Sequence, residues 1–411
     1  MQVTFSRSRA KGQITAPPSK SMAHRLLICA GLASGTSVIH GISPSEDVLA
    51  TLDCLGVLGA KCALHQNTVT VQGVDVGSAV PQETLFCRES GSTLRFLIPV
   101  ALLYEKTVAF HGAPSLLKRP MGIYQALCEE KGLYFLQNES GIHVKGRLPF
   151  GTYTLPGNVS SQFVSGLLYA LPLTEGDSEI HLIPPVESRS YIDLTLSALR
   201  MFGIHAEWKD SVTLTVPGNQ RYRPCDAVVE GDYSNAAFLD AFSALGGDVS
   251  VDGLCKDSLQ GDRVYRKHFR ALMEGTPTIS IADCPDLGPI LFTLAAALNG
   301  ATFTDIGRLR IKESDRVACM KEELEKFGAK MTVTEDRVTV VKTALHQPNV
   351  PLDGHNDHRI VMSMSVLASK YGGTVRGAEA VAKSYPDFFE TIEKIGIQYQ
   401  ITPEEKDSTS K

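Results

Sequence analysis

The chain has 411 residues, of which 43% are hydrophobic and 21% are charged, and its formal net charge is −5. This composition is typical of a globular protein of two domains, and the negative charge argues against a general nucleic-acid or membrane-surface binder, because such proteins usually present a basic face. Nine cysteines without a CxxC pair, and no apolar run near the roughly 20 residues that span a bilayer, predict a cytoplasmic protein with reduced thiols.

The predicted elements begin with a short strand at Gln2–Phe5. After it, one pattern of helix, strand, second helix and strand pair recurs six times, and such self-similarity defines the fold before any motif does. The first helix of each copy is apolar almost all round and is therefore expected to be buried. These first helices are predicted at 21–32, 92–104, 160–171, 234–245, 289–298 and 358–369.

The second helices are amphipathic, as at 315–327, and end at glycines. The strand pairs alternate apolar and polar residues, as at 330–334 and 337–341, which suits sheets with one packed face. The fourth copy lacks a return strand and the sixth runs out of chain. We therefore expect Gln2–Phe5 and its neighbours to supply a strand to the sixth copy.

This repeat predicts two α/β domains of three copies each. One would span residues 18–228, and the other would combine residues 1–17 with residues 229–411, because the chain turns polar and proline-containing near both crossings. A cleft between two such domains, with buried helices directing their N-termini into it, is a natural site for anions.

Four of the six first helices begin with cations or paired hydroxyls. A single Ser or Thr at a helix start is most often only a cap, but four such starts together favour phosphate or carboxylate binding. The residues are Lys20, Ser21 and Arg25; Gly91, Ser92, Thr93 and Arg95; Ser160, Ser161 and Gln162; and His358 and Arg359.

Loops that precede helices carry a second set: Arg119, Ser188, Tyr191, Lys312, Arg316 and Lys383. Each loop cation alone is more often a solvated surface residue. A negatively charged protein that gathers these cations at one cleft is nevertheless expected to bind small, highly anionic ligands, with Arg making bidentate contacts and Lys acting as a point charge.

Two carboxylates, Asp286 and Glu313, fall among these cations. Asp286 can be a helix cap or an acid–base group, because a carboxylate beside cations stays ionised and can accept a hydroxyl proton. No phosphate-binding or dinucleotide-binding glycine motif, no HExxH and no cysteine pair occurs. We therefore expect no metal and no organic cofactor.

Seven motifs together resemble the 5-enolpyruvylshikimate-3-phosphate synthase family of enolpyruvyl transferases over nearly the whole chain: PPSKSMAHR, SGSTLR, GNVSSQFVS, YIDLTL, IKESDR, NDHR and AKSYPDFF. The resemblance implies an inside-out α/β barrel fold: two domains, each of three βαβαββ-type units with buried helices. It also implies transfer of the enolpyruvyl group of phosphoenolpyruvate to the 5-hydroxyl of shikimate 3-phosphate, in the biosynthesis of chorismate and aromatic amino acids.

The resemblance assigns residues to the two substrates. Shikimate 3-phosphate would be held by Lys20, Ser21, Arg25, Ser160, Ser161, Gln162, Ser188, Asp286 and Lys312. Phosphoenolpyruvate would be held by Lys20, Gly91, Arg119, Gln162, Arg316, Arg359 and Lys383. Tyr191 would lie against the shikimate ring, and Arg95 would support the site rather than contact a ligand.

The implied mechanism uses Asp286 as the base that takes the hydroxyl proton, while Glu313 or Lys20 protonates the methylene carbon. The sequence leaves that last alternative open. We expect a monomer that binds two small molecules and neither nucleic acid nor membrane.

Two positions depart from the family pattern. Glu89 stands in a loop that commonly reads Asn-Ala-Gly-Thr, which places an acid near the phosphoenolpyruvate end, and Arg308 stands where Asn is frequent. Gly91 keeps the space that sensitivity to the phosphoenolpyruvate mimic glyphosate usually needs.

Two other functions are compatible with parts of the pattern. The sister enzyme that transfers enolpyruvyl to UDP-N-acetylglucosamine usually has Lys-Asn where this chain has Lys20-Ser21, and a Cys in the loop that here spans residues 111–118 and contains none. A ring or clamp built from the same repeats would need cations along every copy to face nucleic acid. Both alternatives are disfavoured.

Overall fold

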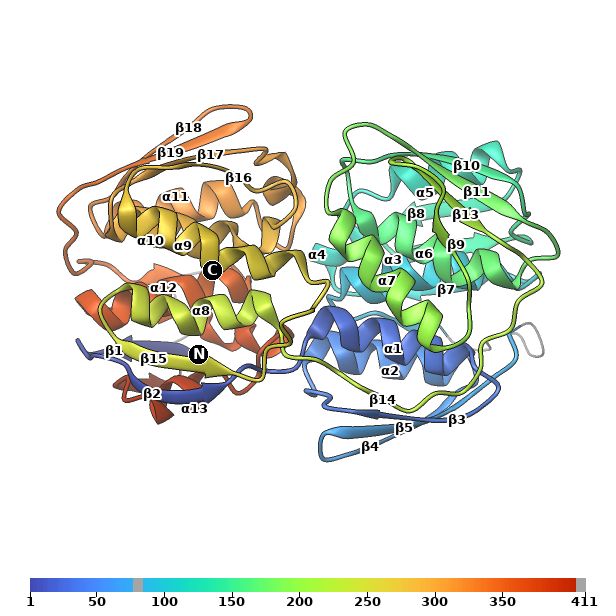
Figure 1. Ribbon diagram of the computed structural model, residues 1–411, viewed down its shortest axis with the longest axis horizontal. Coiled ribbons are helices and arrows are strands. Elements are labelled where there is room, and N and C mark those ends of the chain that lie inside the picture. Colours follow the sequence, from blue (N-terminus) through green and yellow to red (C-terminus); the bar gives the residue numbers. More distant parts are fainter. Residues whose placement is uncertain (77–83, 404–411) are drawn as a thin grey trace, which may run out of the picture. The chain divides into compact units, whose positions relative to one another are not determined.

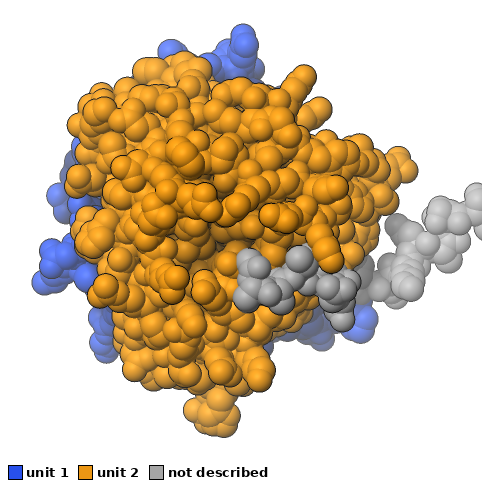
Figure 2. Space-filling model, turned by 90° about the vertical axis from the view of Figure 1, so that its right-hand side faces the viewer, with its two compact units in different colours: residues 1–17, 231–411 blue, residues 18–230 orange. Residues whose placement is uncertain are grey.

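The computed structural model describes residues 1–76 and 84–403 of the chain. They form two compact units, coloured separately in Figure 2: unit 2 is Pro18–Glu230, and unit 1 combines Met1–Pro17 with Gly231–Lys411. In the structure the second crossing follows Glu230, two residues beyond the boundary predicted after residue 228.

Unit 2 contains three copies of the repeat. Its helices are α1 (Lys20–Leu32), α2 (Glu46–Val57), α3 (Gly91–Ala101), α4 (Pro114–Leu117), α5 (Gly122–Glu130), α6 (Ser161–Ala170) and α7 (Arg189–Met201), with a 3-10 turn η1 (Leu171–Leu173). Its strands are β3 (Gly35–His40), β4 (Lys61–His65), β5 (Thr68–Gly73), β6 (Leu85–Phe86), β7 (Val108–His111), β8 (Tyr134–Asn138), β9 (Gly141–Lys145), β10 (Thr152–Pro156), β11 (Ser178–Ile183), β12 (Glu207–Trp208), β13 (Thr213–Val216) and β14 (Ala227–Val228).

The three sheets of unit 2 share one strand arrangement: β14-β3-β5-β4, β6-β7-β9-β8 and β10-β11-β13-β12. In each sheet the first two strands are parallel and the remaining pairs are antiparallel. Strand β14, at the end of the unit's sequence, completes the sheet of the first copy. The repeat read from the sequence therefore corresponds to a repeat in strand pairing.

Unit 1 contains the other three copies. Its helices are α8 (Tyr233–Ala244), α9 (Tyr265–Glu274), α10 (Gly288–Ala297), α11 (Arg316–Lys326), α12 (His358–Tyr371) and α13 (Phe388–Lys394), with 3-10 turns η2 (Gly261–Val264), η3 (Pro285–Leu287), η4 (Gly307–Ile311) and η5 (Ala378–Lys383). Its strands are β1 (Gln2–Phe5), β2 (Lys11–Thr15), β15 (Asp248–Asp252), β16 (Thr278–Ser280), β17 (Ala301–Thr304), β18 (Lys330–Val333), β19 (Arg337–Val341), β20 (Leu352–Asp353), β21 (Gly373–Arg376) and β22 (Tyr399–Thr402).

The N-terminal segment completes two sheets of unit 1. Strand β1 lies between β21 and β22 and is antiparallel to both, which confirms that it joins the sixth copy. Strand β2 instead pairs in parallel with β15 of the fourth copy. The sequence analysis left that copy without a partner strand, because the partner comes from the far end of the chain rather than from a return strand of its own.

The first helices of the copies form the core of each unit and lie between its sheets (Figure 1). Helix α10 is buried from Gly288 through Ala296, and helix α12 from His358 through Ser369. Helix α10 is apolar on nearly every face, and the buried polar residues of α12 beyond its first turn are serines. Burial of both helices therefore removes a large apolar surface from water. Among the described residues, no helix combines the length and apolarity needed to cross a membrane.

Candidate active site

Arg316 is the centre of a charged cluster in unit 1. It is the first residue of α11 and only 1% of it is exposed. Asp315 caps this helix by accepting hydrogen bonds from two backbone N–H groups, which fixes the position of the adjacent arginine. The guanidinium donates to three carboxylates: Nε to Asp357 Oδ2 at 2.9 Å, Nη1 to Asp286 Oδ1 at 2.9 Å, and Nη2 to Glu313 Oε2 at 2.7 Å.

Asp286 lies in η3, directly before α10, and is surrounded by three cations. Its Oδ1 accepts from Arg316 Nη1 and lies 3.3 Å from Lys312 Nζ, and its Oδ2 accepts from Arg359 Nη2 at 3.2 Å. The N-cap position of α10 is Leu287, so Asp286 is not the cap of that helix. The cations favour the charged carboxylate, which is able to accept a proton.

Arg359 enters the same cluster from the start of α12. Asp357 is the N-cap of that helix and accepts from the backbone N–H of Arg359 at 2.9 Å. Arg359 Nη2 donates to Ser234 Oγ at 2.8 Å as well as to Asp286. Its Nε and Nη1 are buried and have no hydrogen-bond partner within the described residues. A buried donor without a partner is costly, so these two groups are suited to an anionic ligand.

The cluster changes the proton affinities of two cations. Burial alone would lower the pKa of Arg316, but Asp357, Glu313 and Asp286 together raise it above its ordinary value. Burial lowers the pKa of Lys312, and the nearby Arg308 and Arg316 oppose its charge while Asp286 favours it. Arg316 is therefore a permanent charge, and Lys312 is the cation of this cluster whose charge is disfavoured.

Lys383, the last residue of η5, reaches the turn that precedes α12. Its Nζ donates to the backbone carbonyl of Asn356 at 2.6 Å. Asn356 lies directly before Asp357, so the lysine contacts the backbone of the segment that holds Arg316 and Arg359. In unit 1 the structure thus brings together residues that the sequence separates by almost a hundred positions: Asp286, Lys312, Glu313, Arg316, Arg359 and Lys383.

In unit 2, two cations extend from the first turns of α1. Ser19 caps this helix by accepting from the backbone N–H of Met22 at 3.3 Å. Lys20 Nζ donates to Asp47 Oδ2 at 2.7 Å. Arg25 is buried and donates to Thr195 Oγ1 at 2.9 Å and to the carbonyls of Ser21 and Tyr191 at 2.6 and 2.9 Å. Arg25 thereby ties α1 to α7.

Gly91 is the first residue of α3, and the guanidinium of Arg119 lies against it. A Cβ built on Gly91 would be 2.6 Å from Arg119 Nη1 and 3.7 Å from Arg95 Nη1. The φ of Gly91 is not in the left-handed region, so the need for glycine here is one of space. The guanidinium of Arg119 therefore lies directly at the start of α3.

Gln162, in the first turn of α6, is held on both sides. Arg95 Nη1 donates to Gln162 Oε1 at 2.8 Å, and Gln162 Nε2 donates to Ser92 Oγ at 2.9 Å. Arg95 is 7% exposed and also lies over the ring of Phe163, 5.1 Å from its centroid. Arg95 therefore connects α3 to the first turn of α6.

The serines lie at helix starts. Ser160 is the N-cap of α6 and accepts from the backbone N–H of Gln162 at 3.3 Å, and Ser161 is the first residue of that helix. Ser188 precedes α7, is fully buried, and has a left-handed φ of 53°. Such a backbone is unusual for serine and is typical of functional positions.

Three residues that hold the predicted ones in place were not identified from the sequence. Asp357 binds Arg316 and caps α12, Asp47 binds Lys20, and Ser234 binds Arg359. Asp357 is part of the motif NDHR, but only His358 and Arg359 of that motif were assigned a role from the sequence. Asp47 offered a weaker signal, because Ser45-Glu46-Asp47 reads as an ordinary helix start.

The two departures from the family pattern have structural accounts. Glu89 Oε1 accepts from Ser115 Oγ at 3.0 Å. Arg308 lies in η4 with only 7% exposure and contributes to lowering the pKa of Lys312.

Solved structures share this fold. EPSP synthase from Acinetobacter baumannii matches with a TM-score of 0.80 at 24% identity, covering 98% of this chain and 100% of that one. The enolpyruvyl transferase NikO from Streptomyces tendae matches with a TM-score of 0.78 at 15% identity, covering 97% and 98%. At these identities the likeness concerns the fold, which is the two-domain α/β fold of enolpyruvyl transferases.

Sequence comparison identifies the family of this chain among the enolpyruvyl transferases. The family model for EPSP synthase (3-phosphoshikimate 1-carboxyvinyltransferase) matches residues 6–392. A 3-phosphoshikimate 1-carboxyvinyltransferase of Clostridium kluyveri is 38% identical over 96% of this chain and 97% of its own length, and one of Clostridium beijerinckii is 36% identical over 94% and 96%. The chain therefore belongs to the EPSP synthase family, as its motifs indicated.

Proposed function

We propose that the protein transfers the enolpyruvyl group of phosphoenolpyruvate to the 5-hydroxyl of shikimate 3-phosphate and releases phosphate, a step in chorismate and aromatic amino-acid biosynthesis. Membership of the EPSP synthase family supports the reaction. The observation that carries its chemistry is the Asp286 carboxylate, which has Lys312, Arg316 and Arg359 within 3.3 Å.

The reaction requires proton transfers at two atoms. Asp286 takes the proton of the attacking hydroxyl, while a proton is added to the methylene carbon of phosphoenolpyruvate, so that its C2 gains carbocation character and bonds to the hydroxyl oxygen. The C–O bond to phosphate then breaks, phosphate leaves, and the new methyl group loses a proton to restore the double bond. Neighbouring cations stabilise the departing anion.

The proposal assigns a set of residues to each substrate. Shikimate 3-phosphate is bound by Lys20, Ser21, Arg25, Ser160, Ser161, Gln162, Ser188, Asp286 and Lys312. Phosphoenolpyruvate is bound by Lys20, Gly91, Arg119, Gln162, Arg316, Arg359 and Lys383. Two features support the phosphoenolpyruvate set: the buried donors of Arg359 and the close approach of Arg119 to Gly91. Both suit an anion held by guanidinium groups.

The donor of the proton to the methylene carbon is Glu313 or Lys20. Glu313 Oε2 accepts from Arg316 Nη2 at 2.7 Å, and Lys20 Nζ donates to Asp47 Oδ2 at 2.7 Å. Incorporation of solvent deuterium into the methylene group of phosphoenolpyruvate separates them. The variant Glu313→Gln or Lys20→Met that abolishes incorporation while the substrate still binds identifies the donor.

We also propose that the protein is a monomer in the cytoplasm that binds neither nucleic acid nor membrane. The net charge of −5 supports the exclusion of nucleic acid. All nine cysteines lie in the described part of the chain and carry free thiols, which supports a reducing compartment.

The test measures phosphate release with both substrates present. Asp286→Ala is expected to lower turnover by about 10²–10⁴-fold, since general bases typically contribute that much. Asp336→Ala, which removes an exposed acid between β18 and β19, is the matched control and should keep wild-type turnover. If Asp286→Ala stayed within about threefold of wild type, Asp286 would not be the base.

A second arm separates the sister reaction. Replacing shikimate 3-phosphate by UDP-N-acetylglucosamine should give no phosphate release above the rate without acceptor. Phosphate release from phosphoenolpyruvate with the nucleotide sugar as the only acceptor would assign the protein to that reaction instead.

A further inference from the structure

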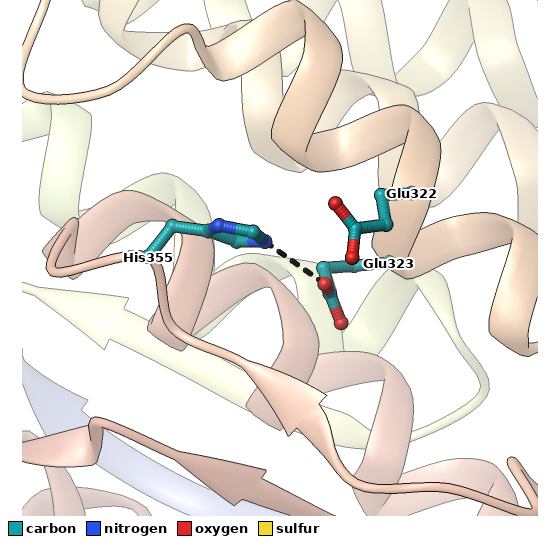
Figure 3. A group of neighbouring side chains, drawn as sticks. All are labelled: Glu322, Glu323 and His355. Carbon is teal, nitrogen blue, oxygen red and sulfur yellow. Dashed lines mark hydrogen bonds and ion pairs between the residues drawn. The ribbon is translucent and has the colours of Figure 1, made fainter. Parts of the chain in front are cut away.

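A second group of ionisable residues lies in unit 1, outside the residues assigned to substrates. Its centre is Glu323 in α11, whose side chain is completely buried. Glu323 Oε1 accepts from Lys326 Nζ at 2.8 Å and from His355 Nε2 at 2.9 Å, and Oε2 accepts from Lys326 Nζ at 2.9 Å and from the backbone N–H of Asp353 at 2.9 Å. Figure 3 shows the ring of His355 directed at this carboxylate.

The group contains the residue types that bind metal ions, but a lysine ammonium already occupies its carboxylate. Ligand atoms of Glu322, Glu323 and His355 lie within 4.8 Å of one another. A carboxylate offers about four lone-pair positions, and those of Glu323 accept four hydrogen bonds. A cation would have to displace the ammonium of Lys326, and Glu322 is 61% exposed. The Glu323 carboxylate is therefore fully hydrogen-bonded without a metal. We call Glu323, its partners Lys326 and His355, and the backbone of Asp353 the Glu323 clamp.

The clamp holds a turn with an unusual backbone. His355 and Asn356 both have left-handed φ angles, 48° and 50°, although neither is glycine. A residue other than glycine is strained in this conformation and persists in it only where its surroundings determine the backbone. Glu323 fixes the turn at two points, the imidazole of His355 and the backbone of Asp353, and Asp353 Oδ1 accepts from the backbone N–H of His355 at 2.6 Å.

The same turn carries the contacts of three cations assigned to phosphoenolpyruvate. The carbonyl of Asn356 accepts from Lys383, and Asp357 binds the guanidinium of Arg316 and caps the helix that begins with His358 and Arg359. Because the chain from Asp353 to Asp357 is only five residues long, a shift at His355 moves these acceptors. The position of the clamp therefore sets the position of the cations.

We propose that Glu323 and His355 are positioning residues for phosphoenolpyruvate: they lock the 353–357 turn so that Lys383, Arg316 and Arg359 present their charges in one arrangement. This proposal rests on the function proposed above. Charge strengthens the lock, since hydrogen bonds with Cys319 and Glu323 raise the pKa of His355 to about 10, which makes its contact with Glu323 an ion pair at neutral pH.

The test compares Glu323→Gln, His355→Asn and the double variant, with Glu322→Gln as the matched control on the same helix. Glutamine cannot accept four hydrogen bonds without turning a donor toward Lys326 or the Asp353 N–H. Asparagine tolerates the left-handed backbone at position 355 while removing the imidazole.

The expected result is a selective loss of phosphoenolpyruvate binding. KM for phosphoenolpyruvate should rise roughly tenfold in each single variant, since displacing a binding group by about 1 Å can cost as much as about 10²-fold. KM for shikimate 3-phosphate should stay within about twofold of wild type, because most of its proposed contacts lie in unit 2. The double variant should match the worse single variant, because both residues act through one turn.

Two results would overturn the proposal. One is an unchanged KM for phosphoenolpyruvate in folded variants, and the other is an equal rise of both KM values together with a lowered Tm, which indicates general destabilisation. If Glu323→Gln does not fold, His355→Asn decides alone. Wild-type phosphate release, measured in the same assay, tests the proposed function separately from this clamp.

Discussion

The Nε of Arg316 lies 2.9 Å from Oδ2 of Asp357, and neither side chain is more than 1% exposed. A carboxylate so completely removed from water is tolerated only when it is paired, and the carboxylate of Asp357 pairs with the guanidinium of Arg316. Asp357 also caps α12 through the backbone N–H of Arg359. One carboxylate therefore connects the starts of two helices.

Asp357→Asn is expected to destabilise unit 1 by about 3 kcal/mol, the lower end of the range for breaking a buried ion pair, because Arg316 retains Asp286 and Glu313. Asparagine keeps the helix cap, so Asp357→Ala should cost about 1 kcal/mol more. Chemical denaturation of the three proteins measures both differences. Equal stability of wild type and Asp357→Asn would contradict the pair's importance.

Gly91→Ala is expected to displace Arg119, because the new Cβ would lie 2.6 Å from its Nη1. The end of a flexible side chain can move, so the protein should fold normally while KM for phosphoenolpyruvate rises about tenfold. Affinity for glyphosate, the mimic of that substrate, should fall at least as much.

Gly122→Ala is the control for this change. Gly122 begins α5 with nothing within 4 Å of its added Cβ, and its φ is not left-handed. That variant should keep both KM values and gain about 0.4–1 kcal/mol of stability from the reduced entropy of the unfolded chain. A similar KM change in both variants would show that the effect at Gly91 is not one of space.

Much of the fold follows from periodicity within short windows. The sixth first helix was predicted at 358–369 and extends over His358–Tyr371, and the strand pair at 330–334 and 337–341 is β18 and β19. Apolar helices and alternating strands report burial locally. The pairing of β2 with β15 could not be predicted this way, because nothing within either strand specifies a partner more than two hundred residues away.

The candidate site likewise has features that the sequence predicts and features that it does not. Cations at helix starts and in loops were recognisable from residue type, and in unit 1 the structure brings Lys312, Arg316 and Arg359 to one carboxylate. The acids that bind these cations, such as Asp357 and Asp47, could not be distinguished from ordinary helix caps and surface acids. Their importance lies in lateral contacts between elements, which sequence spacing does not encode.

Arg359→Lys is expected to weaken phosphoenolpyruvate binding although the charge is kept. Arg359 Nε and Nη1 are buried donors without a partner among the described residues, and a lysine ammonium cannot reproduce this fork. A hydrogen bond to a charged group contributes about 1.5–3 kcal/mol, so KM for phosphoenolpyruvate should rise about tenfold or more.

The rise in Tm that saturating phosphoenolpyruvate gives to the wild type should also shrink in this variant. Arg337→Lys, at the exposed start of β19, is the control and should leave both quantities unchanged. A Tm rise of wild-type size in Arg359→Lys would show that the two buried donors do not meet the ligand.

The Glu323 clamp predicts a specific pH dependence of stability. The titratable groups near the imidazole are Cys319, Glu322, Glu323 and Asp353, together with Lys326, which shares the Glu323 oxygen that His355 contacts. Hydrogen bonds with Cys319 and Glu323 are the main causes that raise the pKa of His355 from 6.5 to about 10. A raised pKa means that the folded protein binds the proton more tightly than the unfolded chain. The stabilisation is therefore complete below pH 6.5 and is lost progressively as the pH rises through 10. The difference in unfolding free energy between wild type and His355→Asn should be largest at pH 6.5 and below, and it should be nearly gone above pH 10. A difference that stays constant over this range would mean that His355 is not charged in the folded protein.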